Sequence, residues 1–242
     1  MISQGGSPVR VLVTGFGPFP GVPENASASL AQALGQCPAV PGVEHFTAIV
    51  PAMWADARAV ARDAVASVRP HAILHFGVSK RSAAFEIETR AVNIGGPKED
   101  CRGVARPGIP LDPSGPPVLQ STLSPLALLR ALRQDGFPAQ LSRNAGRYLC
   151  NALFYWSLAD ASAAGPLVSF IHMPALGQDT DVQPRLTMET AAAGALVLIR
   201  ASARAVLGAM RNGNAFCGGN RNGSQAFHGG GRSRRVVRYK CR

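Results

Sequence analysis

Two side chains in the sequence combine the chemistry of a nucleophile with that of a base. Cys150 follows a Gly-containing turn at residues 144–146 and opens a segment with helical spacing, and His172 follows the apolar run from Val168 to Ile171. A thiol enzyme needs a thiolate, a histidine that keeps it ionised and later protonates the leaving group, and usually a group that orients the imidazole. A helix N-terminus favours the thiolate. Because both residues would reach the same edge of a sheet, the pair indicates nucleophilic cysteine chemistry.

Glu88 is the candidate for the orienting group. It lies in a segment rich in apolar residues, and a half-buried carboxylate needs a partner. Each of the three residues also has a structural interpretation. Cys150 stands among large apolar residues, where a core role outweighs a catalytic one by roughly three to one, and a histidine at a strand end is usually structural. Glu86 and Arg90 would allow a simple ion-pair arrangement around Glu88.

Other kinds of catalytic site are not supported by the sequence. The Gly-x-Ser-x-Gly motif of serine hydrolases, the His-Glu-x-x-His motif of zinc sites and the phosphate-binding loop are absent. The cysteines are odd in number and widely, irregularly spaced, which fits neither a disulfide framework nor a zinc site, so at least one thiol is free. They are Cys37, Cys101, Cys150, Cys217 and Cys241.

A glycine-rich segment, residues 15–21, follows a predicted strand and invites comparison with a dinucleotide-binding loop. Pro18 and Pro20 remove backbone N–H donors where a phosphate cradle needs them, and the next predicted strand ends without an acidic residue for a ribose. Dinucleotide binding is therefore disfavoured. Two interpretations remain: a rigid turn, or a loop whose Phe16 and Phe19 wall a small apolar pocket.

The elements that must position these residues alternate between strands and helices. Such alternation predicts a largely parallel sheet covered on both faces, with ligands bound beyond the carboxyl ends of the strands. The Gly- and Pro-rich segment from Gly95 to Gly115 is predicted to be a long functional loop. We expect strands at Arg10–Thr14, Val43–Val50, His71–Phe76, Ala84–Ile94, Ala139–Ser142 and Pro166–His172, and helices at about Asn25–Gly35, Trp54–Val68, Leu126–Arg133, Arg147–Ala163 and Arg185–Met210.

Composition bounds the size and number of domains. The 242 residues carry a formal net charge of +11, and 46% of them are hydrophobic. That is enough apolar material for one α/β domain, and it excludes a chain that is disordered throughout. Eight basic residues and no acidic ones follow from Arg211 onward, so most of the net charge belongs to the C-terminal end. We expect one domain over residues 1–210 and a disordered basic tail over residues 211–242.

The apolar runs in the sequence are short. The best candidate for a membrane span, Ala191 to Ile199, is closed by Arg200 well before the roughly 18 uninterrupted apolar residues that a span requires. The run at Val11 to Val13 is too short for the core of a signal peptide. We therefore expect a cytoplasmic protein without membrane association.

The candidate residues described above lie within a set of five short sequence motifs. They are Gly15-Phe16-Gly17-Pro18-Phe19, Asn25-Ala26-Ser27, Glu88-Thr89-Arg90-Ala91-Val92-Asn93, Asn144-Ala145-Gly146-Arg147-Tyr148-Leu149-Cys150-Asn151 and Phe170-Ile171-His172-Met173-Pro174. In this order they resemble the signature blocks of pyroglutamyl-peptidase I, a family also called pyrrolidone-carboxylate peptidase. The resemblance runs from about Val11 to Met210, and its cysteine block is highly specific.

This resemblance implies a single-domain, three-layer α/β/α sandwich around a mostly parallel, mixed sheet. It also implies a cysteine peptidase that hydrolyses an N-terminal pyroglutamyl residue from peptides, without a metal or another cofactor. By motif, Cys150 matches the family nucleophile, His172 the base and acid, and Glu88 the carboxylate that orients the imidazole. The backbone N–H of Cys150 is then expected to meet the oxyanion in acyl transfer.

The resemblance also assigns residues to the substrate. Phe16 and Phe19 match the aromatic residues that embrace the lactam ring, and Tyr148 and Leu149 are expected to bind substrate beside them. The chemistry agrees, because a pyroglutamyl group has no charged amine and its pocket needs apolar faces with a few backbone donors and acceptors. No acidic anchor for an ammonium group is required.

Three departures from the family pattern lie near this site. The motif asparagine, Asn93, is followed by Gly-Gly-Pro-Lys-Glu-Asp-Cys-Arg where members usually carry an Arg-Ile-Pro-Asp-like stretch, and Lys98 is the candidate substitute for that arginine. Lysine is a point charge without a planar fork, so the exchange is not conservative. Ala52 stands where some members have a hydroxyl residue, and Ala26 replaces a common proline. We expect these changes to alter substrate affinity and rate while the triad is intact.

The partners that follow are pyroglutamyl peptides and, as in many bacterial members of the family, further copies of the chain in a dimer or tetramer. An alternative is a weakened homologue that binds nucleic acid or another anion through the basic tail. Charge runs are usually solvated, and the tail lacks a known binding fold, so nucleic acid is the less favoured partner.

Overall fold

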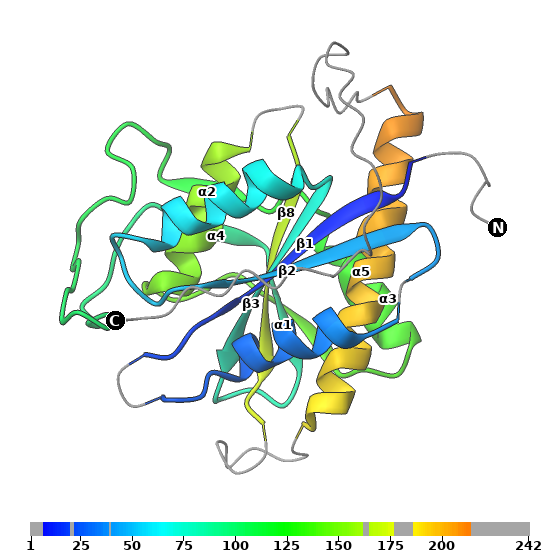
Figure 1. Cartoon of the computed structure of the whole chain (residues 1–242). Helices are drawn as coiled ribbons and strands as arrows, with labels where there is room; N and C mark the ends of the chain where they lie inside the picture. The colour runs from blue at the N-terminus through cyan, green and yellow to red at the C-terminus, as the bar shows by residue number, and fades with distance from the viewer. Residues whose placement is uncertain (1–6, 20–21, 39, 162–164, 177–185, 214–242) are drawn as a thin grey trace, which may run out of the picture.

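The structure is a computed structural model that describes residues 7–19, 22–38, 40–161, 165–176 and 186–213. Within these ranges the chain forms one α/β/α unit (Figure 1). Its elements are β1 (Val9–Phe16), α1 (Ala26–Gln36), β2 (Val43–Val50), α2 (Ala57–Val68), β3 (Ala72–Ser79), β4 (Phe85–Glu88), β5 (Arg90–Val92), β6 (Val118–Gln120), α3 (Pro125–Gln134), β7 (Ala139–Ser142), α4 (Leu149–Asp160), β8 (Leu167–Pro174) and α5 (Met188–Arg211).

Six strands form the main sheet in the order β2-β1-β3-β8-β4-β7. The first four in this order are parallel to one another, whereas β4 runs antiparallel to β8 and parallel to β7. The predicted mixed, mostly parallel sheet is therefore confirmed. The register pairs His172 of β8 with Gly77 of β3, and Phe170 of β8 with Glu88 of β4. Because β4 runs antiparallel to β8, its last residue lies opposite Phe170, two residues before His172.

Helices cover both faces of this sheet, which confirms the predicted three layers. The α1, α3 and α5 helices lie on one side and α2 and α4 on the other (Figure 1). Alternate residues of each central strand enter different cores: Leu74 of β3 packs on the α1, α3 and α5 side, whereas Ile73 packs on the α2 and α4 side. Both cores are built from fully buried aliphatic and aromatic side chains, which is the main stabilising contribution in a domain of this size.

The α5 helix is the one described helix that is long and apolar enough to cross a membrane. Half of its most apolar 18-residue stretch is buried inside the fold. Arg200 and Arg204 divide its apolar residues, so the sequence contains no uninterrupted apolar run of that length. The helix packs against α1, α3 and β1, as the core helix of a globular domain does.

Most predicted elements differ by one to three residues at their ends, and three differences have a visible physical cause. The α2 helix begins at Ala57 and not at Trp54, because the Trp54 N–H donates to a side-chain oxygen of Asp100 (2.8 Å) and holds the preceding turn outside the helix. The expected strand from Ala84 to Ile94 divides at Thr89, whose N–H and hydroxyl both donate to the Ser142 carbonyl. Its second half becomes β5, which pairs with β6, a three-residue strand between Pro-rich turns that carries too little pattern to be predicted.

The predicted loop from Gly95 to Gly115 contains no helix or strand, as expected. Its ends are held by Asn93, whose side chain both donates to and accepts from the Asp112 backbone (2.7 and 2.9 Å). Its middle is held by Asp100, which accepts from three backbone N–H groups. Burial alone would raise the pKa of Asp100, but these donors hold it below its ordinary value. The loop is therefore built around two polar side chains.

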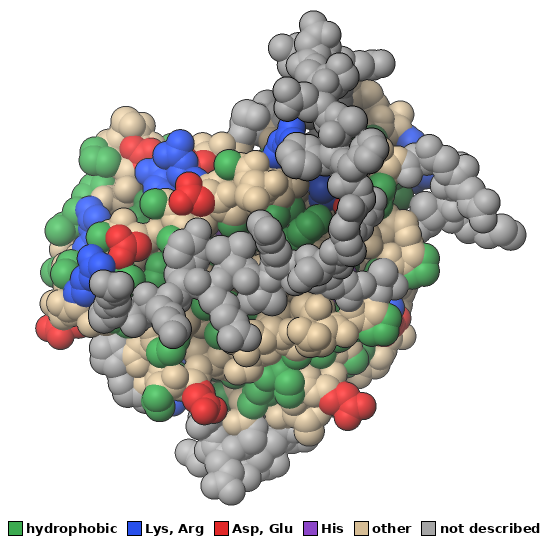
Figure 2. Space-filling view, in the orientation of Figure 1, with side chains coloured by type: hydrophobic (Ala, Val, Ile, Leu, Met, Phe, Trp, Pro, Cys, Tyr) green, Lys and Arg blue, Asp and Glu red, His purple; other side chains and the backbone are tan. Residues whose placement is uncertain are grey.

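The molecular surface over α2 and α4 carries charged side chains of both signs (Figure 2). In Figure 2, basic and acidic side chains lie together over the side formed by α2 and α4. Two of the contacts are ion pairs, Arg58 with Asp160 (2.6 Å) and Arg102 with Asp56 (3.2 Å). The predicted basic tail lies outside the described residues from residue 214 onward, so its order stays a prediction.

Candidate active site

Cys150 is the second residue of α4. The helix follows Tyr148, which has an extended backbone with φ −107° and ψ −164°. N–H groups in the first turn of a helix have no partner within the helix, and they carry its partial positive charge. A negative charge on the Cys150 sulfur would therefore be stabilised by the helix start. The expectation that Cys150 lies at a helix N-terminus is confirmed.

His172 and Glu88 meet at the junction of β8 and β4. Their side chains are buried, and His172 Nδ1 lies 2.9 Å from Glu88 Oε1. The imidazole is also hydrogen-bonded to the Cys150 side chain. The structure thus joins the three residues in the order carboxylate, imidazole and thiol, although Glu88 and His172 are 84 residues apart in the sequence.

The charge state of the imidazole follows from these partners. Burial alone would lower the pKa of His172, but the hydrogen bonds to Cys150 and Glu88, with the attraction of their negative charges, raise it to about 10. The Glu88 side chain is fully buried, and its second oxygen, Oε2, has no hydrogen-bond partner among the described residues. An isolated carboxylate is costly at such a site, so a positive His172 compensates it.

The simpler ion-pair interpretation of Glu88 is wrong in the described part of the chain. Glu86 accepts a hydrogen bond from Gln140 (3.1 Å), and Arg90 donates to the backbone carbonyl of Arg143 (3.1 Å). Neither of these hydrogen bonds involves the Glu88 carboxylate. The carboxylate is directed to the imidazole instead.

Gly77 provides the space in which the thiol and the imidazole meet. A Cβ atom at this position would lie 3.0 Å from His172 Cδ2, 3.0 Å from Phe170 Cζ and 3.1 Å from Cys150 Sγ. Few real Cβ atoms have contacts this short. The sequence marks Gly77 only as a strand-ending glycine, and its role becomes visible when β3 is paired with β8.

A cavity of about 470 Å³ opens beside Cys150. Its volume falls within the 300–1,000 Å³ that is typical of small-ligand sites. All four predicted substrate-binding residues line it, and they are Phe16, Phe19, Tyr148 and Leu149. Phe16 and Leu149 are buried, and the Phe19 and Tyr148 rings meet edge to face with centroids 6.4 Å apart. The interpretation of Phe16 and Phe19 as pocket walls is thus favoured over that of an ordinary turn.

The loop that carries these phenylalanines is fastened to the start of α1. Ser27 Oγ accepts a hydrogen bond from the Phe16 N–H (3.0 Å), and the Asn25 side chain donates to the Gly17 carbonyl (3.1 Å). Asn25 also accepts from the Ser27 N–H, as an N-cap residue does. Asn25 is therefore the N-cap of α1, and Ser27 fixes the pocket wall.

Asn151 is a further residue whose role sequence reasoning missed. Its buried side chain accepts from the Val92 N–H and donates to the Val92 carbonyl, both at 2.8 Å. It thereby ties the start of α4, one residue after Cys150, to β5, which begins two residues after Glu88. The only sequence signal was its membership of the cysteine block.

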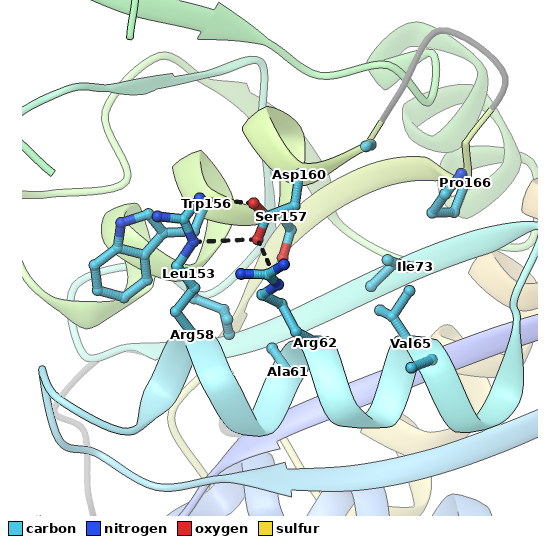
Figure 3. Close-up of a pocket in the computed structure, with 12 residues that line it drawn as sticks. Arg58, Ala61, Arg62, Val65, Ile73, Leu153, Trp156, Ser157, Asp160 and Pro166 are labelled. Carbon is cyan, nitrogen blue, oxygen red and sulfur yellow. Dashed lines mark hydrogen bonds and ion pairs between the residues drawn. The ribbon is translucent and has the colours of Figure 1, made fainter. Parts of the chain in front are cut away.

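A second cavity, of about 220 Å³, lies between α2 and α4 (Figure 3). Arg58 and Arg62 point from α2 toward Asp160 of α4, and Ser157 lies beside them. Ser157 Oγ is 2.9 Å from His75 Nε2. Burial lowers the pKa of His75 to about 3, so this histidine is a poor base for activating the serine.

Within the described ranges, no group of three or more His, Cys, Asp or Glu side chains is arranged to hold a metal ion. Cys37, Cys101 and Cys150, the cysteines of the described ranges, form no disulfide with one another, and Cys150 agrees with the expected free thiol.

Comparison with known proteins connects this geometry to a family. A family model described as pyroglutamyl peptidase matches residues 9–205. The pyrrolidone-carboxylate peptidase of Mycobacterium marinum is 32% identical over 208 residues, covering 79% of this chain and 91% of that protein. That of Vibrio vulnificus is 33% identical over 188 residues, covering 76% and 88%.

Solved structures agree. A variant of the pyrrolidone carboxyl peptidase from Pyrococcus furiosus has a TM-score of 0.76 and 27% identity, and the match covers 82% of this chain and 100% of that chain. Pyroglutamyl peptidase I from Bacillus amyloliquefaciens has the same fold, with a TM-score of 0.76 at 24% identity and coverage of 81% and 97%. The chain, with its partly buried thiol and its buried imidazole and carboxylate beside an aromatic cavity, therefore belongs to the pyroglutamyl peptidase family.

Proposed function

We propose that this chain is a cysteine peptidase that removes an N-terminal pyroglutamyl residue from peptides, with Cys150 as nucleophile, His172 as base and acid, and Glu88 as the group that orients the imidazole. The observation that carries the proposal is the hydrogen-bonded series from Glu88 through His172 to Cys150, beside a cavity with aromatic walls. Nucleophile, base and orienting group within contact are the general signature of covalent acyl transfer.

The first half of the reaction forms a thioester. The Cys150 thiolate attacks the carbonyl carbon that joins pyroglutamate to the next residue, and the C–N bond of that peptide link breaks. His172, held as an imidazolium by Glu88, gives its proton to the departing amine. The backbone N–H of Cys150, at the start of α4, supports the negative charge that develops on the carbonyl oxygen.

The second half regenerates the enzyme. Neutral His172 takes a proton from a water molecule, which attacks the thioester carbonyl, and the C–S bond breaks to release pyroglutamic acid. The proton is retained on His172, which restores the pair of thiolate and imidazolium. Both halves use one imidazole as acid and then as base, so a fixed ring orientation is valuable, and the 2.9 Å contact with Glu88 supports that role.

The cavity suits an uncharged ring. Phe16 and Leu149 supply buried apolar surface, and Phe19 and Tyr148 add two partly exposed aromatic faces. A pyroglutamyl group lacks the α-ammonium of an ordinary N-terminus, so an apolar wall discriminates between the two by the cost of burying an unpaired charge.

The alternative of a weakened homologue acting as an anion-binding protein is not favoured. The relatives carry the name of the peptidase, and the proposed triad lies together, with Glu88 and His172 buried and Cys150 partly buried. The tail on which the alternative depends lies outside the described residues from residue 214 onward.

A chromogenic pyroglutamyl amide assay under reducing conditions tests the proposal. Wild-type protein is expected to turn over the substrate, and Cys150→Ala is expected to show none above background. Turnover that survives the substitution would exclude Cys150 as the nucleophile. A reduced, folded wild type without turnover would contradict the activity itself.

We further propose that the enzyme works in the cytoplasm and as a dimer or tetramer. The location is supported by the cysteines of the described ranges, which form no disulfide with one another, as is usual in a reducing compartment. The assembly rests on the resemblance to bacterial members of the family. Light scattering after size exclusion would give the mass, and a monomer at micromolar concentration would contradict the assembly.

A further inference from the structure

The loop after β5 brings a cation to the catalytic cavity. Lys98 lines this cavity, and its Nζ lies 4.4 Å from the ring centroid of Phe19 and 4.9 Å from that of Tyr148. Ammonium groups are attracted to aromatic faces at such distances. Although Lys98 is exposed, its ammonium group lies between the Phe19 and Tyr148 rings, which line the proposed substrate cavity.

The backbone around Lys98 is also fastened to these walls. The Tyr148 hydroxyl donates to the Glu99 carbonyl (3.0 Å), and the Cys101 thiol donates to the Pro18 carbonyl (3.1 Å). The segment is thus tied to both the phenylalanine loop and the residue that precedes α4. Its cation therefore has a defined position relative to Cys150.

The charge of Lys98 has no counterion in the described part of the chain. The ion pairs found there do not include it. Two other charged residues line the cavity, Glu24 and Lys80, and their formal charges cancel. The remaining formal charge among the Lys, Arg, Asp and Glu side chains that line the cavity is therefore the positive charge of Lys98, beside Phe19 and Tyr148.

A pyroglutamyl ring cannot use that charge, because the lactam is neutral. The cavity of about 470 Å³ has room for more than a five-membered ring. Resting on the proposed peptidase function, we propose that Lys98 is a specificity-determining residue that binds a carboxylate on the residue after the scissile bond. That carboxylate is either an acidic side chain or the free α-carboxylate of a dipeptide.

The expected size of the effect is modest. Lys98 is solvent-exposed, so its attraction for a carboxylate is screened by water and salt. We expect an acidic substrate to have a kcat/KM about three- to fivefold above that of its neutral counterpart at low ionic strength. The contact is made before and during the reaction, so the difference should lie in KM and not in kcat.

The test compares three peptides on the full chain: pyroglutamyl-glutamate amide, pyroglutamyl-glutamine amide and pyroglutamyl-glutamine with a free C-terminus. The first and third add a carboxylate, at the side chain or at the α position, to the neutral second. Each ratio of kcat/KM values against the neutral peptide is measured within one protein. We expect at least one ratio above one in the wild type, falling toward one at high salt.

Variants assign the preference to Lys98. Lys98→Met keeps the length of the side chain without its charge and should bring the ratios to about one, and Lys98→Arg should retain them. Arg204→Met removes an exposed charge from α5, on the other side of the sheet, and should leave the ratios at the wild-type values. A wild type without any preference, or a Lys98→Met protein with the wild-type ratios, would overturn the inference. A wild type that cleaves none of the peptides would instead refute the proposed function.

Discussion

Two buried histidines occupy neighbouring strands on the same face of the sheet, and each stands between an oxygen-bearing side chain and a candidate nucleophile. His172 joins Glu88 to Cys150, and His75 joins Thr14 (2.7 Å) to Ser157 (2.9 Å). The two rings even share a neighbour, because Phe170 lies 4.9 Å from the His172 ring and 6.2 Å from the His75 ring, centroid to centroid.

Their protonation states are nevertheless opposite. Burial lowers the pKa of His75 to about 3, because two hydroxyl groups cannot compensate a positive ring. Burial acts on His172 in the same direction, but the carboxylate and the thiol raise its pKa to about 10. Hydrogen-bond geometry alone therefore does not make a catalytic site. The charge of the partners decides whether a buried histidine can hold and transfer a proton at neutral pH.

Substitution of the two candidate nucleophiles, Cys150 and Ser157, should give the largest difference in turnover. Cys150→Ala removes the proposed attacking atom, and we expect turnover of a pyroglutamyl amide to fall by at least about 10⁴-fold. Ser157→Ala, the matched change in the other cluster, should leave turnover within about threefold of wild type, since Ser157 lines a separate cavity. Steady-state rates of the two variants give the comparison directly. A larger loss at Ser157 than at Cys150 would reverse the assignment of the two clusters.

The carboxylate should have the next largest effect. Glu88→Gln keeps the shape of the side chain but removes the charge that holds His172 protonated, and we expect kcat/KM to fall by about 10²- to 10⁴-fold. A raised pKa means that the imidazolium persists until the pH rises through about 10, so the alkaline limb of the wild-type profile should lie there. In the variant this limb should move to lower pH. An unmoved limb would show that Glu88 does not act through His172.

Gly77 tests how much space the catalytic cluster requires. Gly77→Ala adds a Cβ within 3.1 Å of both His172 and Cys150, and we expect a 10- to 100-fold loss of kcat/KM, on the order of what a misplacement of 1 Å costs. Gly208→Ala is the control, because its Cβ on α5 would meet nothing within 4 Å. That change should retain activity and add about 0.5–1 kcal/mol of stability. Equal activity in the two variants would contradict the packing argument.

The last prediction concerns stability at His75 and not turnover. Its pKa is lower in the folded than in the unfolded chain, so the unfolded state binds the extra proton between about pH 6.5 and 3. Stability should be complete above pH 6.5 and fall by about 1.4 kcal/mol per pH unit below it. Urea unfolding of wild type and His75→Gln from pH 4 to 7 checks this, because the variant should lose that part of the slope. Parallel curves would mean that His75 does not stay neutral.

Local patterns were sufficient to predict most of the elements. The β2 and β7 strands have the predicted bounds, because β2 ends at Pro51 and β7 lies between Pro138 and the Gly-containing turn at residues 144–146. Cys150 was predicted at a helix start from the Gly-containing turn before it, and His172 from its apolar strand. These features depend only on neighbours in the sequence, where periodicity and turn chemistry act.

Contacts between distant segments were not accessible to the same reasoning. The contact between Glu88 and His172 requires that β4 joins β8 in the antiparallel direction, and a short strand carries no signal for its partner. Gly77 and Lys98 have their roles for the same reason, since each meets side chains from other elements. The family motifs supplied the triad, but its geometry and the cation in the cavity are properties of the fold.

The opposite protonation of the two histidines is the central claim, and nitrogen-15 NMR of the imidazole rings at pH 7 tests it most directly. His75→Gln and His172→Gln variants assign the two signals. We predict the shift pattern of a protonated ring for His172 in the wild type and of a neutral ring for His75, with His172 becoming neutral only as the pH approaches about 10. A His172 ring that is neutral at pH 7 with Cys150 reduced would contradict the account.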